Sequence, residues 1–501
     1  MSEAYYITTA ISYPNGAPHI GHAYEAIAAD VIARFQKAQG RDVRFQTGTD
    51  EHGLKMAQAA RTEGNDPAIY AEKMSRKFRA MCDAIDVNYD RFIRTSEPDH
   101  HRASQAIWQA MEANGDLYLG RYEGWYSVRD EAFYEESELT EGEGGKLSPQ
   151  GTPVDWTVEE SWFFKLSAYQ QKLLDHYAAH PGFIQPDSRR NEVLRFVEGG
   201  LNDLSISRTS FDWGIKVPGG DGAHVMYVWL DALTNYLTGL GYPDGGELFD
   251  RYWPANVHLI GKDVVRFHAV YWPAFLMSAK IALPRQIYGH GFLLSRGEKM
   301  SKSVGNVVDP LDLAARYGVD ALRYFLLREV TFGQDGSYSH EAIVSRVNAE
   351  LANSFGNLAQ RSLSMIFKNL GGVLPAPGTT EEDHTLLETV LTACRDTLPA
   401  EFERFAFAAG LEAWMAAVYA CNAYVDKTAP WGLKKTDPDR MAAVLGTLVV
   451  VIRELALAVA PIIPGSSAKL IGLINGGEGG KPIAQPTPIF PRLELEEVGA
   501  A

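Results

Sequence analysis

Two histidines, three residues apart, form the first candidate site. They belong to Asn15-Gly16-Ala17-Pro18-His19-Ile20-Gly21-His22, which follows an apolar run and opens a helical pattern. Backbone N–H groups at a helix N-terminus favour anions, and residues three apart can face the same way, so both imidazoles could donate hydrogen bonds to phosphate oxygens. Gly21 would let the flat face of a base approach the backbone. A structural histidine pair or a partial metal site would show the same pattern, although no third ligand is nearby in the sequence.

Two lysines, also three residues apart, form a second candidate site. Lys299 and Lys302 lie in Gly297-Glu298-Lys299-Met300-Ser301-Lys302-Ser303, shortly after an expected strand at 286–289. Phosphoryl transfer needs positive charge where charge accumulates on the leaving phosphates. A solvated basic loop is the alternative for this segment by itself. The histidine pair at the other end of the same sheet favours a phosphate site.

The elements that would position these residues alternate between strand and helix. Strands are expected at 5–12, 43–47, 257–260 and 286–289, and helices at about 20–39 and 263–279. This alternation predicts an α/β fold with a Rossmann-like, doubly wound parallel sheet. Such sheets bind ligands at the carboxyl ends of their strands.

An insertion and a helical region complete the predicted organisation. Residues 115–222 are rich in aromatic residues and break the alternation, which favours an α+β insertion between the two halves of the sheet. Helical patterns dominate after about residue 339 and predict an all-α bundle. We therefore predict four parts: a split catalytic domain at 1–114 and 223–308, a connective insertion at 115–222, a linking segment at 309–340 and a helical domain at 341–501.

Composition limits the compartment and the partners. The chain has 501 residues, 47 Lys and Arg against 63 Asp and Glu, and three widely spaced cysteines, which argues against a disulfide framework and for a reducing compartment. Residues 1–5 lack the basic and apolar regions of a secretory signal, and Arg453 and Glu454 interrupt the apolar stretch 442–463, which we expect to be a buried helix. We therefore expect a cytoplasmic protein with no membrane partner. The net charge of −16 argues on its face against a nucleic-acid partner.

The two candidate segments resemble the HIGH and KMSKS signatures of class I aminoacyl-tRNA synthetases. Further blocks, spread over nearly the whole chain, narrow the resemblance to the methionine–tRNA ligase family. They are Ala10-Ile11-Ser12-Tyr13, Thr49-Asp50-Glu51-His52-Gly53, Trp229-Leu230-Asp231-Ala232, Gly261-Lys262-Asp263, Phe267-His268-Ala269-Val270-Tyr271-Trp272-Pro273 and Val425-Asp426-Lys427-Thr428-Ala429-Pro430-Trp431.

The resemblance implies a two-step reaction. Methionine attacks the α-phosphate of ATP to give methionyl-adenylate and pyrophosphate, and the acyl group then passes to the terminal ribose of tRNA(Met). His19 and His22 would stabilise the α-phosphate in the transition state, and Lys299 and Lys302 would neutralise the leaving pyrophosphate alongside Mg²⁺, which is inferred from ATP chemistry. The ATP-binding residues implied by the resemblance are Gly21, Glu25, Gly261, Asp263 and Lys302.

The resemblance also implies a methionine site. Asp50 would hold the α-ammonium group, and aromatic residues would suit the polarizable sulfur. Core packing is the alternative for each aromatic residue taken alone. The side-chain pocket would comprise Ile11, Tyr13, Trp229, Ala232, Leu233, Tyr236 and His268.

Two departures from the wider family lead to further expectations. Residues 115–222 contain no cysteine, so we expect a metal-free knuckle and no zinc. The chain ends soon after the helical domain, without the appended C-terminal module of longer members, which predicts a monomer. By resemblance, homocysteine would be rejected through cyclisation of its adenylate in the synthetic site, since one methyl group is worth only ~1–3 kcal/mol in an apolar pocket.

The helical domain is expected to read the tRNA. By resemblance, Asn357, Arg361, Pro430 and Trp431 recognise the CAU anticodon of initiator and elongator tRNA(Met). Without the resemblance, an ordinary polar helix face and a capping Pro-Trp would be the preferred explanation. Residues 331–501 hold 13 Lys and Arg against 19 Asp and Glu, so binding must rely on local basic groups, stacking and base edges. Two other functions stay open: a class I synthetase for another amino acid, and an inactive tRNA-binding paralogue.

Overall fold

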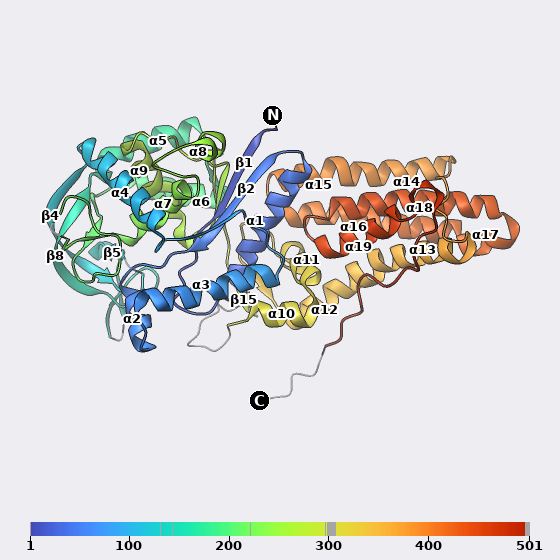
Figure 1. The fold of residues 1–501 in the computed structure, drawn as a ribbon, viewed down its shortest axis with the longest axis horizontal. Helices are drawn as coiled ribbons and strands as arrows, with labels where there is room; N and C mark the ends of the chain where they lie inside the picture. The colour runs from blue at the N-terminus through green and yellow to red at the C-terminus, as the bar shows by residue number, and fades with distance from the viewer. Residues whose placement is uncertain are drawn as a thin grey trace. The chain divides into compact units, whose positions relative to one another are not determined.

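The computed structural model describes residues 2–130, 132–142, 144–220, 222–295, 297 and 307–495. The chain divides into two compact units, one of residues 1–83 and 87–290 and the other of residues 84–86 and 291–501. Figure 1 shows the helices and strands of both units.

A six-stranded parallel sheet forms the centre of the first unit. Its order is β3-β2-β1-β13-β14-β9, and Ile7 of β1 pairs with Phe45 on one side and Val257 on the other. The strand order reverses between β1 and β13, which is the position where doubly wound sheets bind ligands. The predicted Rossmann-like sheet is therefore confirmed. The strands are β1 (Ala4–Thr9), β2 (Asp42–Thr49), β3 (Arg91–Arg94), β9 (Ile184–Gln185), β13 (Val257–Gly261) and β14 (Ile287–His290).

Helices of the first unit pack on this sheet and on one another. The first, α1 (Ile20–Ala38), packs on β1, β2 and β13, and the apolar residues at its helical spacing are buried as predicted. Helix α4 packs against α7. The other helices that position the site are α2 (Leu54–Thr62), α3 (Pro67–Ala84), α4 (Pro98–Ala113), α7 (Val228–Thr238) and α9 (Trp272–Ser278).

The helix expected at 263–279 is present, but it is not a regular α-helix throughout. The segment begins with a 3₁₀ turn at Lys262–Val264, widens into a π-helical turn at Phe267–Tyr271, and continues as α9. Pro273 lacks the N–H that an α-helix would donate to the carbonyl of Ala269. The hydroxyl of Tyr177 donates to that carbonyl instead, at 2.5 Å. The widened turn carries His268 into the core.

The inserted region has a sheet of its own, as predicted. Strands β4 (Leu117–Ser127) and β8 (Asp155–Phe164) form a long antiparallel pair, flanked by β5 (Ala132–Tyr134) and β10 (Leu204–Ser205). Helices α5 (Gln170–Ala179) and α6 (Asp187–Glu198) follow β8. Strand β9 lies between these two helices in the chain and joins the main sheet beyond β14.

Among the described residues of the second unit the regular structure is helical, apart from the pairing of β15 (Leu293–Ser295) with β16 (Gly336–Tyr338) and an isolated bridge between Val373 and Pro482. Helix α18 packs against α13, α14, α16, α17 and α19, which run beside it in Figure 1. The predicted helical bundle is therefore confirmed. Its α-helices are α10 (Pro310–Tyr317), α11 (Val319–Glu329), α12 (His340–Arg346), α13 (Asn357–Asn369), α14 (Glu381–Leu391), α15 (Leu398–Glu403), α16 (Phe407–Thr428), α17 (Pro430–Thr436), α18 (Pro438–Ala458) and α19 (Pro464–Asn475).

Within the described residues, α18 is the one helix long and apolar enough to cross a membrane. Most of its apolar side chains are buried in the bundle. The two charged residues that interrupt its apolar stretch are paired, Arg453 with Glu478 and Glu454 with Arg395. The expectation of a buried core helix for this stretch is therefore confirmed.

Candidate active site

The histidine pair begins α1 at the carboxyl edge of the sheet. His19 is the N-cap residue, and its Nδ1 accepts the backbone N–H of Gly21 at 3.1 Å. The Nδ1 atom of His22 accepts the backbone N–H of His19, also at 3.1 Å, and the ring centroids lie 3.8 Å apart. Because both Nδ1 atoms accept, the proton of each neutral ring belongs on Nε2. The pair therefore provides two N–H donors at a helix N-terminus, which suits an anion.

Gly21 has a steric role in this pair. A Cβ atom built at this position would lie 2.9 Å from Cε1 of the His19 ring, closer than real Cβ contacts. The glycine lets the His19 imidazole fold over the first turn of α1. This steric role is additional to the predicted one, in which Gly21 lets the face of a base approach the backbone.

Glu25 connects α1 to the ends of two other strands. It accepts a hydrogen bond from Nε2 of His290, at the end of β14, over 2.9 Å, and another from the backbone of Gly261, at the end of β13. Burial raises the pKa of Glu25, these two hydrogen bonds oppose that rise, and nearby Asp263 adds to it. The structure thus brings Glu25, Gly261 and Asp263 together, as expected for residues of one site. His290 was missed, because nothing in the sequence indicates a partner 265 residues away.

The predicted aromatic residues of the methionine pocket lie together on α7 and the π-helical turn. Tyr236 donates its hydroxyl hydrogen to Nε2 of His268 at 2.6 Å, and Nδ1–H of His268 donates to the carbonyl of Val264 at 3.0 Å. Burial lowers the pKa of His268 to about 4, so this imidazole is neutral near pH 7. Trp229 stacks on Phe267 with 3.8 Å between ring centroids and presents its edge to His268. Phe267 was not among the predicted residues.

The other residues of the predicted pocket, which include the aromatic Tyr13, share this location only in part. Ala232 and Leu233 are buried on α7, at spacings that put them on one face with Trp229 and Tyr236. Ile11 and Tyr13 lie in the segment after β1. Ile11 is half-buried there. Tyr13 packs against the core that contains Tyr236, and its hydroxyl donates to the carbonyl of His52, in the turn after β2, at 2.8 Å.

Asp50 lies where β2 ends, next to the segment that follows β1. Its side chain is 7% exposed, and its backbone N–H donates to the carbonyl of Ser12 at 2.9 Å. Because Ser12 lies between Ile11 and Tyr13 in the sequence, this hydrogen bond brings Asp50, the predicted ammonium-binding residue, next to their segment. A carboxylate at this edge of the sheet can bind a cationic group.

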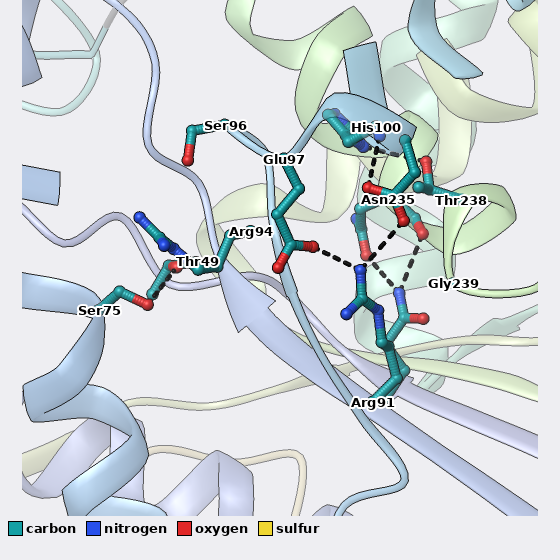
Figure 2. Close-up of polar contacts among 12 residues, drawn as sticks. Thr49, Ser75, Arg91, Arg94, Ser96, Glu97, His100, Asn235, Thr238 and Gly239 are labelled. Carbon is teal, nitrogen blue, oxygen red and sulfur yellow. Dashed lines mark hydrogen bonds and ion pairs between the residues drawn. The ribbon is translucent and has the colours of Figure 1, made fainter. Parts of the chain in front are cut away.

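A buried polar network around Glu51, the residue after Asp50, was not predicted from the sequence. The Glu51 carboxylate is fully buried and accepts two hydrogen bonds from Arg94, at 2.8 and 3.0 Å. Thr49 donates its hydroxyl hydrogen to the same carboxylate at 2.8 Å. The Thr49 hydroxyl oxygen also lies 3.2 Å from the Ser75 hydroxyl (Figure 2). Four consecutive polar residues after a buried strand, Thr49 to His52, were the available signal for such a network.

Two predictions are not tested by the described residues: the role of the two lysines and the absence of zinc. Lys299 and Lys302 lie outside the described residues. Within the described ranges, no cluster of three or more His, Cys, Asp or Glu side chains could hold a metal ion. The absence of zinc stays a prediction.

The predicted anticodon residues form a cluster in the second unit. The Arg361 guanidinium lies 5.4 Å from the ring centroid of Trp431, and Asn357 is one turn before Arg361 on the exposed face of α13. Pro430 begins α17, and Ala429 before it takes a left-handed conformation with φ 42°. Trp431 is 51% exposed, so its ring is accessible for stacking.

Comparison with known proteins supports both halves of this description. Residues 5–363 match the family model described as tRNA synthetases class I (M), and residues 374–484 match the anticodon binding domain of methionyl tRNA ligase. The methionine–tRNA ligase of Brucella suis is 57% identical over 512 residues, covering 99% of each chain. That of Mycobacterium bovis is 54% identical and covers 98% of each chain.

Solved structures agree with the sequence relatives. The Mycobacterium tuberculosis methionyl-tRNA synthetase in complex with methionyl-adenylate has a TM-score of 0.95 and 54% identity, over 98% of this chain and 100% of that chain. Its apo form has a TM-score of 0.88 and 50% identity, over 99% of each chain. The chain described here belongs to the methionine–tRNA ligase family of class I tRNA synthetases.

Proposed function

We propose that the residues gathered at the carboxyl edge of the sheet activate L-methionine with ATP, and that the helical unit selects tRNA(Met) as acceptor. The observation that carries this proposal is the joint placement in one unit of the His19–His22 donor pair, the Glu25–His290 hydrogen bond next to Gly261, and the Tyr236–His268 hydrogen bond. The related structure bound to methionyl-adenylate supports the same product.

Methionine binds with its ammonium group at Asp50 and its thioether among Trp229, Tyr236 and His268. The neutral His268 ring suits an apolar side chain, because a charged ring in this buried pocket would need a counter-ion. The Tyr236 hydroxyl is oriented by its hydrogen bond to His268. An apolar pocket with a few oriented polar groups is typical of small-molecule sites.

ATP binds across the point where the strand order reverses. The Nε2–H groups of His19 and His22 stabilise negative charge at the α-phosphate, while Glu25, Gly261 and Asp263 meet the nucleoside. Lys299 and Lys302 neutralise the pyrophosphate. Mg²⁺ accompanies the ATP phosphates, and the described residues offer no carboxylate cluster as its ligands. Little covalent work falls to the protein in this reaction, so positioning and charge stabilisation supply most of the rate enhancement.

The tRNA is read by Asn357, Arg361, Pro430 and Trp431. The Arg361–Trp431 contact supports this role, because an exposed aromatic ring beside a guanidinium group can stack an unpaired base. We also propose a cytoplasmic monomer with a metal-free insertion, and the domain boundaries given above. Light scattering tests the monomer, and elemental analysis showing one zinc per chain would refute the metal-free insertion.

Amino-acid-dependent exchange between ATP and pyrophosphate tests the proposal. The assay is run with each of the twenty amino acids and then with tRNA. We expect exchange with methionine and charging of tRNA(Met). Exchange with a different amino acid would favour the second class I function, and no exchange at all would favour an inactive paralogue.

A further inference from the structure

One fully buried carboxylate joins three elements of the first unit. Oδ2 of Asp231, on α7, lies 2.7 Å from Nδ1 of His52, in the turn after β2. Oδ1 of Asp231 lies 2.7 Å from Nε2 of His100, on α4. Asp231 and His100 are 0% exposed and His52 is 3% exposed. None of the three belongs to the predicted site.

The charge of Asp231 fixes the direction of its two contacts. On its other side, Nδ1 of His100 lies 3.0 Å from the Thr238 hydroxyl (Figure 2). Burial alone would raise the pKa of Asp231, but His52 and His100 hold it below its ordinary value. The carboxylate is therefore ionised and accepts from both rings. Removing one partner of such a buried group is costly, because the other is left without compensation.

The His52 contact holds the turn that carries Asp50. The backbone N–H of Asp50 donates to Ser12, and that of Glu51 to the Thr95 hydroxyl. The carbonyl of Glu51 accepts from the Trp213 indole at 2.6 Å, and the carbonyl of His52 accepts from Tyr13. The backbone of the turn is thus tied to neighbouring loops. The His52 side chain ties it to α7.

Helix α7 carries the other half of the methionine pocket. Asp231 lies between Trp229 and Ala232 in the sequence, and Tyr236 follows on the same helix. We propose that Asp231, acting through His52, is a positioning residue that sets Asp50 against the pocket residues of α7. This inference rests on the proposed function, in which Asp50 binds the ammonium group of methionine.

A double-mutant cycle with Asp50 tests the inference. Asp231→Asn keeps the shape of the side chain but removes its charge. We expect the KM for methionine in pyrophosphate exchange to rise roughly 10- to 100-fold, with the KM for ATP unchanged, because a misplaced binding group loses orientation. In an Asp50→Asn background the same substitution should add less than about twofold, because coupled residues are not additive. A full additional effect in that background would overturn the inference, whereas a wild-type protein without methionine-dependent exchange would overturn the proposed function instead.

A second pair of variants covers the case in which Asp231→Asn does not fold. His52→Ala removes the donor to Asp231, whereas His52→Asn offers an amide N–H near the position of Nδ1. We expect His52→Ala to raise the KM for methionine and His52→Asn to restore most of the loss. Equal impairment of the two would overturn the inference.

Asp383→Asn provides a matched control for the loss of a buried carboxylate. Asp383 is fully buried in the second unit and is held by Arg440 and Tyr424. We expect this variant to lower stability while leaving the KM for methionine unchanged. A similar rise in KM for Asp383→Asn would show that general destabilisation causes the effect, and would overturn the inference.

Discussion

The imidazoles of His19 and His22 contact each other at the first turn of α1, and each accepts a backbone hydrogen bond there. Nδ1 of His22 accepts the N–H of His19, Nδ1 of His19 accepts the N–H of Gly21, and the rings lie 3.8 Å apart. One nitrogen of each ring is thus engaged in capping the helix. The other nitrogen carries the proton that can be donated to phosphate. Capping and the proposed contact with phosphate use different atoms of the same side chains, so they can be separated by substitution.

His19→Asn should separate these two roles. Asparagine is a good N-cap residue, so we expect the free energy of unfolding to change by less than about 1 kcal/mol. The Nε2–H donor is lost, so the rate of methionyl-adenylate formation should fall about 10²- to 10³-fold. Urea denaturation and pyrophosphate exchange measure the two effects. His19→Ala is the comparison, since it should lose the cap as well as the rate, and full activity of His19→Asn would contradict the assignment.

Lys302→Ala should abolish exchange without weakening methionine binding. The lysine is assigned to the leaving pyrophosphate, where charge develops only during the reaction, and it makes no contact with the amino acid in this assignment. We expect exchange to fall at least about 100-fold, while equilibrium dialysis gives an unchanged Kd for methionine. Lys481→Ala, on the exposed surface of the helical unit, is the control and should retain exchange. Weaker methionine binding in Lys302→Ala would contradict this role.

Trp431→Ala should affect the second step alone. An exposed ring that stacks an anticodon base is worth ~1–3 kcal/mol, so charging of tRNA(Met) at limiting tRNA should fall about 10- to 100-fold. Pyrophosphate exchange without tRNA should stay the same. Tyr419 on α16 is also 51% exposed, and Tyr419→Ala is the matched control, with charging expected to be retained. A comparable loss of exchange and charging in Trp431→Ala would refute the anticodon assignment.

Features set by neighbouring residues were predictable from the sequence. The helix that follows His19 and the closeness of the His19 and His22 rings depend on contacts three or four residues apart, which periodicity and capping rules describe. The α18 helix was recognised as a core element because Arg453 and Glu454 interrupt its apolar surface. These features needed no knowledge of the tertiary fold.

Features that join distant segments were not predictable in this way. His290 pairs with Glu25 across 265 residues, and Asp231 meets His52 and His100 across 179 and 131 residues. Such pairings depend on strand order, which composition and periodicity do not specify. The π-helical turn around His268 was missed for a related reason, since the hydroxyl that compensates for Pro273 comes from Tyr177 on α5.

The buried neutral state of His268 predicts a dependence of stability on pH. Its pKa of about 4 in the folded protein lies below the ordinary value of 6.5, so the unfolded chain takes up a proton first as the pH falls. Stability contributed by the neutral ring is therefore present above about pH 6.5 and is lost as the pH falls toward 4. Between pH 7.5 and pH 5 the loss amounts to about 2 kcal/mol.

His268→Gln removes this titration and should flatten that part of the pH dependence. Urea denaturation at pH 7.5 and pH 5, followed by tryptophan fluorescence, gives the free energy of unfolding of both proteins. We expect the wild-type protein to lose about 2 kcal/mol more than the variant over this range. His258, whose pKa is lowered by burial and in addition by His268, remains in both proteins. Equal losses in the two proteins would mean that His268 is not held neutral by burial, and the apolar character assigned to the methionine pocket would fail with it.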